Sequence, residues 1–416
     1  MKNIIQQIRN AITGTEFEGK TYIAGGFVRD QVLGLKNNDL DITVELPEGG
    51  IRLAGYLFEK GLASKPVLYQ EFGTALTIMG DYKIEFVMTR NESYRKGCRK
   101  PATNSGTIYE DICRRDFTIN SLIMDIMTGE IYDLSGKGMA DIKAGIIRST
   151  SEPDIIFNDD PLRILRAVRF ANRFDYTIEE NTLKGIFKDC GELVNISWER
   201  KRDEFEKILI SPNAQNGLKM LFDFGLMEYL IPELVNVKDD ICFNSIIALP
   251  EITEPRLAIL LAVLVQNGNN DALIKTIISR LKFSNRILQN CLLLLHFLEI
   301  VNNLINTKNY DDLALRKFYY QHKELYPEYL SYLSTHFTCI EKESEFESAE
   351  IRALQVIHEI GGKKYPLNGT ILKEQFYLPE GKELGQVVNY GLEIWLRMPE
   401  RNRDELLLII KEKYSY

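Results

Sequence analysis

The sequence predicts an α+β protein, with a small mixed β-sheet and its helices in the N-terminal part and helices alone in the remainder. Two observations predict this class. Alternating apolar residues bounded by glycine turns, the pattern of strands, are confined to the first third of the chain. From about Asp141 onward, apolar residues recur at helical spacing instead. With 416 residues, the chain is long enough for two to four domains.

The most informative stretch predicts a strand that enters a short helix through two glycines. The apolar run 22–24 is followed by Gly25 and Gly26, and residues 27–33 then read as an amphipathic helix. Glycines let backbone N–H groups approach phosphates at the positive end of a helix, and Arg29 can bind a phosphate bidentately. Gly25, Gly26 and Arg29 are therefore predicted to bind a triphosphate.

The strand that follows carries paired carboxylates. In residues 39–44 apolar residues alternate with Asp39 and Asp41, so the two carboxylates project from one face. Such a pair can converge on Mg²⁺ ions for in-line phosphoryl transfer, and Glu85, in a strand of its own, is a candidate third carboxylate. Each feature alone is common, but their combination within twenty residues favours a functional site. We predict Asp39, Asp41 and Glu85 as catalytic residues, with Asp39 and Asp41 as ligands of Mg²⁺.

The other elements follow in chain order. The patterns predict helices over residues 3–12 and 50–60, strand pairs over 74–88 and 122–132, helices over 161–174, 178–187 and 199–210, and helices from 217 to the end. Residues 89–107 are polar, basic and poorly periodic, which predicts a mobile loop beside the site.

Charge is acidic overall and basic in places. The net charge of −8 argues against a simple nucleic-acid binder. Two local clusters leave a basic track for RNA possible. The first lies in the polar loop and the second in one helical sector: Arg90, Arg95, Lys96, Arg99 and Lys100, and Arg163, Arg166, Arg169 and Arg173.

Cysteine, histidine and apolar runs exclude several classes of site. The six cysteines contain no Cys-x-x-Cys, so neither a disulfide framework nor a zinc site is predicted. The four histidines are isolated and are expected to be core or surface residues. We find no secretory signal and no apolar run that would span a bilayer, so we expect a cytoplasmic protein with no membrane partner.

Two further motifs join charged residues to apolar runs. Residues 114–120 read Arg-Arg-Asp-Phe-Thr-Ile-Asn, which fits either sugar and triphosphate recognition or a buried ion-pair cluster. Asp160 and Arg163 would lie on one face of a helix that begins near Pro161. Cytosine and adenine both offer an amino donor beside a ring-nitrogen acceptor, so this pair would admit C and A and refuse U and G. The alternative is a helix cap with an ordinary ion pair.

In this order the motifs resemble those of class II tRNA nucleotidyltransferases, whose core bacterial poly(A) polymerases share. The matching residues are Gly25-Gly26-x-x-Arg29-Asp30 with Asp39-x-Asp41, Arg114-Arg115-Asp116-Phe117-Thr118-x-Asn120, Asp160-x-x-Arg163 with Arg166-Ala-x-Arg169-Phe170, and Glu199-Arg200. The resemblance implies a seahorse-shaped protein with a head (1–145), neck (146–211), body (212–325) and tRNA-binding tail (326–416). It implies template-independent addition of CCA to tRNA 3′ ends from CTP and ATP, with no stable protein partner.

The same resemblance assigns site residues. Arg115, Asp116 and Asn120 would lie by the nucleotide, and Asp160 with Arg163 would read its base. Arg166 and Arg169, on the same predicted helix, join the nucleotide-binding set. Asp159 stands where the family commonly has glutamate, which leaves its part in recognition open.

Three alternatives stay open at this point. A poly(A) polymerase of this type would resemble Gly-Arg-Arg-Phe where this chain has Gly73-Thr74-Ala75. An enzyme that adds only A is possible. Enzymes that add only CC resemble the family with this loop shortened, so the full-length segment 91–113 disfavours that activity. A catalytically silent RNA-binding module is disfavoured by the intact Asp39 and Asp41.

Overall fold

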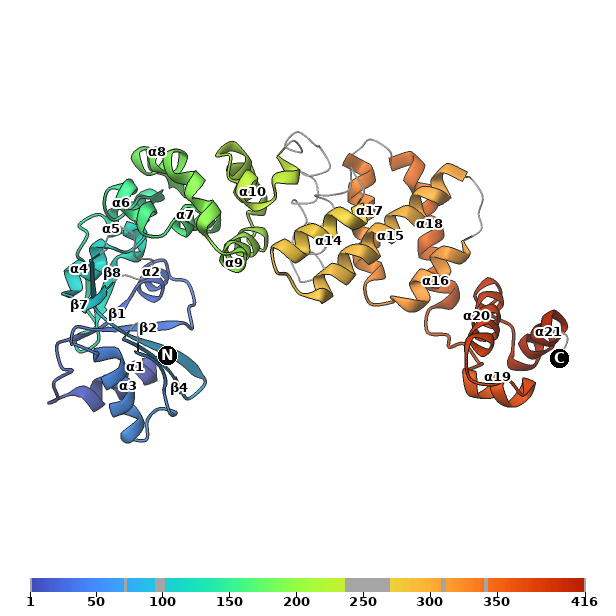
Figure 1. Cartoon of the computed structure of the whole chain (residues 1–416), viewed down its shortest axis with the longest axis horizontal. Helices are drawn as coiled ribbons and strands as arrows, with labels where there is room; N and C mark the ends of the chain where they lie inside the picture. Colours follow the sequence, from blue (N-terminus) through green and yellow to red (C-terminus); the bar gives the residue numbers. More distant parts are fainter. Residues whose placement is uncertain are drawn as a thin grey trace. The chain divides into compact units, whose positions relative to one another are not determined.

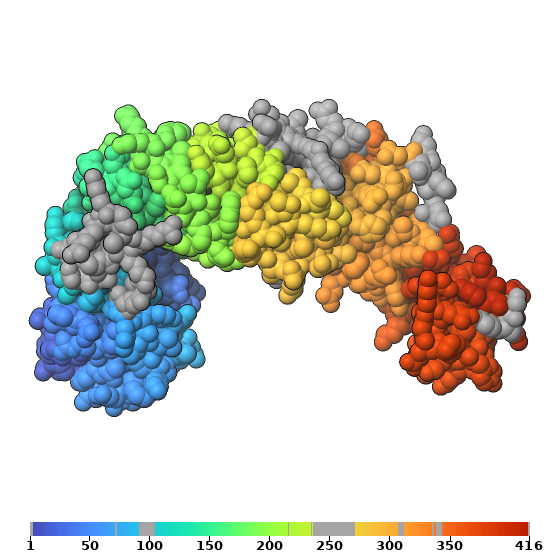
Figure 2. All heavy atoms as spheres, viewed as in Figure 1, coloured from blue at the N-terminus to red at the C-terminus, as the bar shows by residue number. Residues whose placement is uncertain are grey.

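A computed structural model describes residues 2–70, 73–93, 102–235, 270–307, 312–339 and 343–414 of the chain (Figure 1). The chain divides into two compact units, Met1–Tyr229 and Leu230–Tyr416. The first unit holds a mixed sheet and helices, and the described part of the second is helical. This confirms the predicted α+β class. Figure 2 shows the same chain with all its heavy atoms, with the residues outside the described ranges in grey.

The main sheet has seven strands in the order β3-β4-β5-β2-β1-β8-β9. Their bounds are β1 Thr21–Ala24, β2 Leu40–Val44, β3 Val67–Tyr69, β4 Thr74–Met79, β5 Tyr82–Met88, β8 Leu122–Asp125 and β9 Ile131–Asp133. The pair β2–β5 is parallel and the other neighbours are antiparallel. The sheet is therefore mixed, and the predicted hairpins over 74–88 and 122–132 are both present.

One face of this sheet is the core of the head. Leu40, Ile42 and Val44 of β2 are buried, as are Ile84 and Phe86 of β5. Helix α3 (Gly49–Glu59) packs on β2, β4 and β5, and α1 (Lys2–Ile12) precedes β1 in the chain (Figure 1). The alternation along the strands leaves the opposite face for polar side chains.

Residues 90–93 and 102–105 are more regular than the sequence indicated. The predicted loop instead contains the antiparallel strands β6 (Arg90–Ser93) and β7 (Ala102–Ser105). Polar strands paired only with each other lack the apolar alternation by which a strand is recognised. The basic residues Arg95, Lys96, Arg99 and Lys100 lie outside the described residues.

A helical layer completes the first unit. It contains α2 Gly26–Val32, α4 Ile108–Cys113, α5 Gly138–Ala144, α6 Pro153–Asp159, α7 Leu162–Phe174, α8 Glu180–Asp189, α9 Trp198–Leu209, α10 Ala214–Asp223 and α11 Met227–Leu230. Helices α7 and α9 pack side by side (Figure 1). A short parallel pair, β10 (Ile146–Ile147) with β11 (Thr177–Ile178), lies where the sequence predicted helices alone, because two residues are too few to show a period.

The second unit is built from paired helices. They are α14 Asn270–Arg280, α15 Asn285–Thr307, α16 Leu313–Gln321, α17 Tyr326–Cys339, α18 Glu343–Ile360, α19 Gly369–Phe376, α20 Lys382–Arg397 and α21 Arg403–Tyr414. Phe297, Phe318 and Tyr326 form an aromatic cluster between α15, α16 and α17. Buried Arg316 joins three elements, through Asp312, Glu359 and the carbonyl of Leu396.

Helix α15 corrects the expectation that no apolar run is long enough to span a bilayer. Residues Asn285–Asn306 are long and apolar enough to cross a membrane by length and composition alone. In the structure, however, Cys291, Leu294 and Phe297 are buried, and the helix packs against α14, α16, α17 and α18. Its apolar residues are therefore used for packing within the second unit, and one such helix is weak support for a membrane span.

Candidate active site

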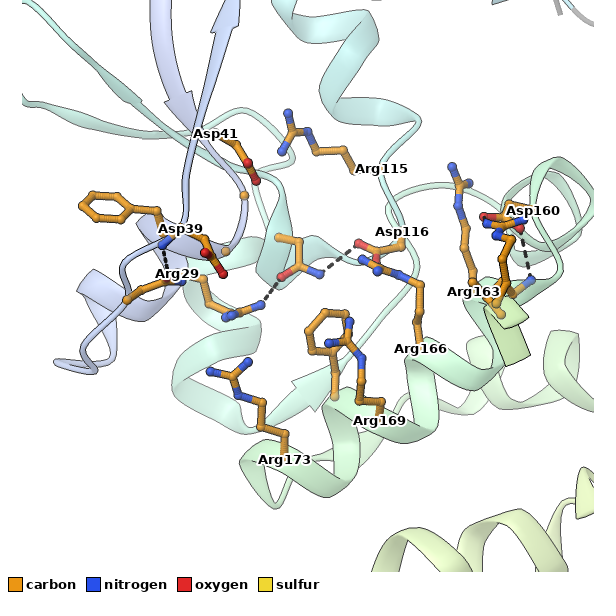
Figure 3. Close-up of a pocket in the computed structure, with 18 residues that line it drawn as sticks. Arg29, Asp39, Asp41, Arg115, Asp116, Asp160, Arg163, Arg166, Arg169 and Arg173 are labelled. Atoms are coloured by element: carbon orange, nitrogen blue, oxygen red, sulfur yellow. Dashed lines mark hydrogen bonds and ion pairs between the residues drawn. The ribbon is translucent and has the colours of Figure 1, made fainter. Parts of the chain in front are cut away.

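A cleft of about 590 Å³ lies within the first unit, between the sheet and helix α7. It is lined by Gly25, Gly26, Phe27, Arg29, Asn37, Asp39, Asp41, Arg115, Asp116, Asn120, Asp160, Leu162, Arg163, Arg166, Arg169, Phe170, Arg173 and Arg200 (Figure 3). Every predicted site residue except Glu85 is in this set. Seven arginines face four aspartates, so the lining has an excess of positive charge that suits a polyphosphate.

The carboxylates lie at the strand end of the cleft. Asp41 is in β2, and Asp39 directly precedes that strand. Glu85 of β5 is the register partner of Asp41, so the two side chains project from the same face of neighbouring strands. Although the Asp41 side chain is open to the cleft, desolvation by the surrounding protein atoms raises its pKa to about 6. The charges of Glu85 and Asp39 raise the pKa further, and the charge of Arg115 opposes the shift. This corner of the cleft is short of positive charge.

A divalent cation fits this donor set. Among the residues that the structure describes, no group of three or more His, Cys, Asp or Glu side chains could hold a metal ion by itself. Mg²⁺ in nucleotide enzymes is commonly bound through one or two carboxylates, with phosphates and water completing the octahedron. Asp39 and Asp41 supply such a pair, and a cation would offset both the desolvation that chiefly raises the pKa of Asp41 and the smaller repulsion from Glu85 and Asp39.

The glycine turn makes room for an arginine. Gly25 has φ 74° and ψ −132°, a backbone conformation that favours glycine. A Cβ atom at Gly25 would lie 3.0 Å from NH1 of Arg115, whose Nε and NH2 donate to Asp111. Gly25 therefore lets Arg115 reach the floor of the cleft beside β1, close enough to Asp41 to lower the pKa of that carboxyl.

A chain of hydrogen bonds crosses the cleft floor from α2 to α7 (Figure 3). Arg29 NH1 donates to Asn120 Oδ1 (2.5 Å), and Asn120 Nδ2 donates to Asp116 Oδ1 (2.9 Å). Arg166 Nε then donates to Asp116 Oδ2 (2.8 Å). Arg29, Asp116 and Asn120 are buried, so this chain is a fixed structure and not a flexible surface network.

Asp116 is held in its ionised form. Burial opposes ionisation, but the charge of Arg166 and hydrogen bonds from Asn120, Arg166 and the Phe117 backbone outweigh it and lower the pKa of Asp116 to about 2. The same contact raises the pKa of Arg166. The buried ion-pair interpretation of residues 114–120 is therefore confirmed, and because Asp116 also lines the cleft, sugar and triphosphate recognition stays a prediction.

Helix α9 supplies the counter-charges for α7. Glu204, which is 3% exposed, lies 2.6 Å from Nε of Arg169, and burial lowers the pKa of Arg169 to about 10. One turn earlier in α9, Arg200 NH2 donates to Asp160 Oδ2 (2.7 Å). The two helices therefore hold each other in register through pairs of opposite sign.

Asp160 and Arg163 face the same cleft but do not pair with each other. Asp160 has extended backbone angles at the end of α6, and Pro161 begins the next helix, so the assumption that Asp160 and Arg163 share a helical face is wrong. Arg163 NH1 instead donates to the carbonyl of Ile156 (3.1 Å) and lies 3.9 Å from Asp159. A guanidinium has five donors and a carboxylate about four acceptor sites, so both groups retain capacity for a base.

Several residues at this site escaped the sequence predictions. Asn37 donates to Asp30 (2.7 Å) and accepts from the backbone N–H of Asp39, which connects α2 to the carboxylate strand. Glu204 stands in an ordinary charged helix face and carries no motif. Only the tertiary contact between α7 and α9 shows its use.

Comparisons with known proteins agree with this geometry. Residues 21–148 match the family described as poly A polymerase head domain, and residues 175–237 match the probable RNA and SrmB-binding site of polymerase A. The chain therefore carries a nucleotidyltransferase head domain and the RNA-binding domain that follows it, and its relatives include proteins named CCA tRNA nucleotidyltransferase and CCA-adding enzyme.

Individual relatives match part of the chain in sequence, and a solved structure matches nearly all of it in fold. The mitochondrial CCA tRNA nucleotidyltransferase of Candida glabrata is 37% identical over 48% of this chain and 41% of its own length. The CCA-adding enzyme of Enterococcus faecalis is 34% identical over 65% of this chain and 64% of its own length. The chain thus spans less than two thirds of the length of the curated relatives it matches. A solved structure of the Thermotoga maritima CCA-adding enzyme complexed with tRNA_CCA is 26% identical, with a TM-score of 0.68 over 99% of this chain and 95% of that one.

Enzymes of this family generally depend on a divalent metal. The carboxylates of Asp39 and Asp41 suit such a metal ion, because their oxygens are typical ligands of divalent cations.

Proposed function

We propose that the protein adds CCA to tRNA 3′ ends from CTP and ATP, with release of pyrophosphate. The names of its relatives support this activity, and one observation carries it. A single cleft combines the carboxylates of Asp39 and Asp41, at the start of strand β2, with Asp160 before helix α7 and Arg163 in its first turn. A nucleotide bound between them would present its phosphates to Asp39 and Asp41 while its base faces Asp160 and Arg163.

At the strand end, the chain's own groups would orient the reacting phosphate. Asp39 and Asp41 would hold Mg²⁺, with Glu85 adjacent to Asp41 as a third carboxylate. Bound there, the ion would activate the tRNA 3′ hydroxyl and stabilise the departing pyrophosphate. Gly25 and Gly26 lack side chains that would block the approach of a triphosphate to the backbone.

The middle of the cleft would bind the sugar and phosphates. Asn120 and Asp116 are fixed by Arg29 and Arg166, so polar atoms at the floor are already in position before a nucleotide binds. Arg115 lies beside Gly25 and would contact the phosphates. Arg166 and Arg169, which contact Asp116 and Glu204, would present guanidinium donors along α7.

The base would be read at the helix end. Arg163 can donate to the ring nitrogen of C or A, and Asp160 can accept from the exocyclic amino group. Uracil and guanine present the reverse pattern and would lose both hydrogen bonds. Because Arg200 fixes Asp160 and the Ile156 carbonyl fixes Arg163, the two groups are held apart at a defined spacing rather than paired with each other.

The proposal includes the wider organisation of the chain. We propose that the chain divides into head, neck, body and tail at residues 145, 211 and 325. The tail and neighbouring helices would bind the acceptor stem of the tRNA. We propose action in the cytoplasm, although two relatives are named mitochondrial.

The test is incorporation with one nucleotide at a time. Full-length protein is incubated with tRNAs ending at the discriminator base, at C and at CC, each with CTP, ATP, UTP or GTP. We expect C on the first two ends and a single A on the third. Repeated A addition to any RNA end would identify a poly(A) polymerase, and A addition to the CC end alone would identify an A-adding enzyme.

A further inference from the structure

Four arginines follow one face of α7 along the cleft. Arg163, Arg166, Arg169 and Arg173 all line it, and ten residues of helix separate the first from the last by roughly 15 Å. Figure 3 places Arg163 beside Asp160 at one end of the cleft and Arg173 with Arg29 and Asp39 at the other. The row therefore runs from the base-reading end to the phosphate end.

Two arginines in the middle of this row each have a buried carboxylate at close range, although Glu204 also contacts Arg166 and Lys207. Arg166 lies 2.5 Å from Asp116 and Arg169 lies 2.6 Å from Glu204. Both carboxylates are buried, so their charges act at close range on the arginines. A bound nucleotide would meet little net charge at these two positions.

Arg173 has no carboxylate this close among the described residues. Its NH2 lies 3.6 Å from Oδ2 of Asp30, but Arg29 already contacts Oδ1 of the same carboxylate through Nε (2.7 Å) and NH2 (2.6 Å). Asn37 donates to Oδ2 at 2.7 Å. Two guanidinium groups thus share the Asp30 carboxylate, and Arg173, which makes the longer contact, retains donors for a ligand.

The two arginines differ in access. Arg29 is 3% exposed, all three of its guanidinium nitrogens have partners in the protein, and it lies over the rings of Phe170 and Phe174 at 5.3 and 4.7 Å. The Arg173 side chain is 45% exposed and faces the cleft. A phosphate entering the cleft can therefore reach Arg173 without breaking a buried hydrogen bond, whereas reaching Arg29 would cost such bonds.

We propose that Arg173 binds the terminal phosphates of the nucleotide, the two that leave as pyrophosphate, while Arg29, which the sequence predicted as a triphosphate ligand, instead holds Asn120 in place. This rests on the proposed function and adds the residue that receives the leaving group. Arginine suits the task because its planar donors bind phosphate oxygens in pairs.

The experiment measures pyrophosphate affinity without any transfer reaction. Full-length protein is titrated calorimetrically with inorganic pyrophosphate and, separately, with CTP, both with Mg²⁺. Arg173→Gln should weaken both affinities by about tenfold, the scale of one charge-assisted hydrogen bond, and Arg173→Lys should recover part of the loss. Arg202→Gln, the matched control on α9 outside the cleft lining, should bind as the wild type does. Arg29→Gln should lower the unfolding midpoint yet keep pyrophosphate affinity within about twofold.

Unchanged pyrophosphate affinity in Arg173→Gln would overturn the proposal, and a loss of tRNA affinity in the same variant would mark Arg173 as an RNA contact. The reverse pattern, with Arg29→Gln losing pyrophosphate and Arg173→Gln keeping it, would also overturn it. If Arg29→Gln does not fold, the two Arg173 variants and the Arg202 control still decide. Wild-type protein that extends no tRNA would refute the proposed function, but the difference between Arg173→Gln and Arg202→Gln would still test this phosphate site.

Discussion

The two ends of the cleft handle charge in opposite ways. At the strand end, Asp41 and Glu85 lie side by side without a dedicated cation, and the pKa of Asp41 rises to about 6. At the helix end, Asp160 is paired with Arg200, and Glu204 is paired with Arg169. The strand end is therefore incomplete without ligands, whereas the helix end is already complete in the free protein.

This difference separates chemistry from recognition. Unsatisfied carboxylates attract a metal ion and the phosphates that come with it, so their removal should affect turnover more than folding. Preformed ion pairs fix donors and acceptors before binding, so removing one partner should alter selectivity and stability together. Each prediction below tests one side of that contrast.

The largest effect is expected at the strand end. Asp41→Asn removes a charge but keeps the shape, so incorporation of both C and A should fall by roughly a thousandfold or more. Affinity for tRNA should change little, because RNA is held mainly by basic groups. Asp81→Asn, in the turn between β4 and β5, is the matched control and should retain activity. Substantial incorporation by Asp41→Asn, measured in single turnover, would remove Asp41 from the metal site.

At the helix end, Arg163→Ala should damage selectivity. Loss of the donor to the ring nitrogen should cost about 1 to 3 kcal/mol, which raises KM for CTP and ATP and lets UTP and GTP compete. Steady-state kinetics with all four nucleotides measure this, with Arg202→Ala as control. Unchanged preference for C and A over U and G would assign Arg163 to helix packing through the Ile156 carbonyl.

The free energy of unfolding at acid pH should depend on Asp116. Its folded pKa of about 2 lies below the usual value near 3.8, so ionised Asp116 stabilises the fold above pH 4 and loses that contribution as the pH falls from about 4 to 2. The shift corresponds to about 2 kcal/mol. Asp116→Asn should therefore be less stable than wild type at pH 7, with a gap that narrows at low pH.

Urea unfolding at pH 7, 5, 4 and 3 would follow this gap. Asp81→Asn, in the turn between β4 and β5, serves again as the control. A gap of constant size across this range would show that Asp116 does not carry the acid dependence.

The smallest effect is expected for Asp159→Glu. Asp159 lies 3.9 Å from Arg163, and Arg163 keeps its hydrogen bond to the Ile156 carbonyl whichever acid is present. The ratio of kcat/KM for CTP over UTP should stay within about twofold of the wild type. A larger change in this ratio would give Asp159 a direct part in base reading.

Local patterns revealed the strand end better than the helix end. The alternation around Asp41 and the strand of Glu85 are properties of neighbouring residues, and the register that joins them follows from the sheet. The partners of Arg29 and Asp160 are 91 and 40 residues away, as Asn120 and Arg200, and no spacing rule in one sequence reaches them. The prediction for Asp160 is wrong for a local reason, because α7 begins only after Pro161 and Asp160 stays extended.

The central claim is that one cleft serves both nucleotides, and equilibrium competition tests it most directly. Asp41→Asn protein, which should bind without turnover, is titrated with labelled CTP in the presence of increasing ATP. We predict one nucleotide per chain at saturation and full displacement of CTP by ATP. Simultaneous binding of CTP and ATP to one chain would contradict the account.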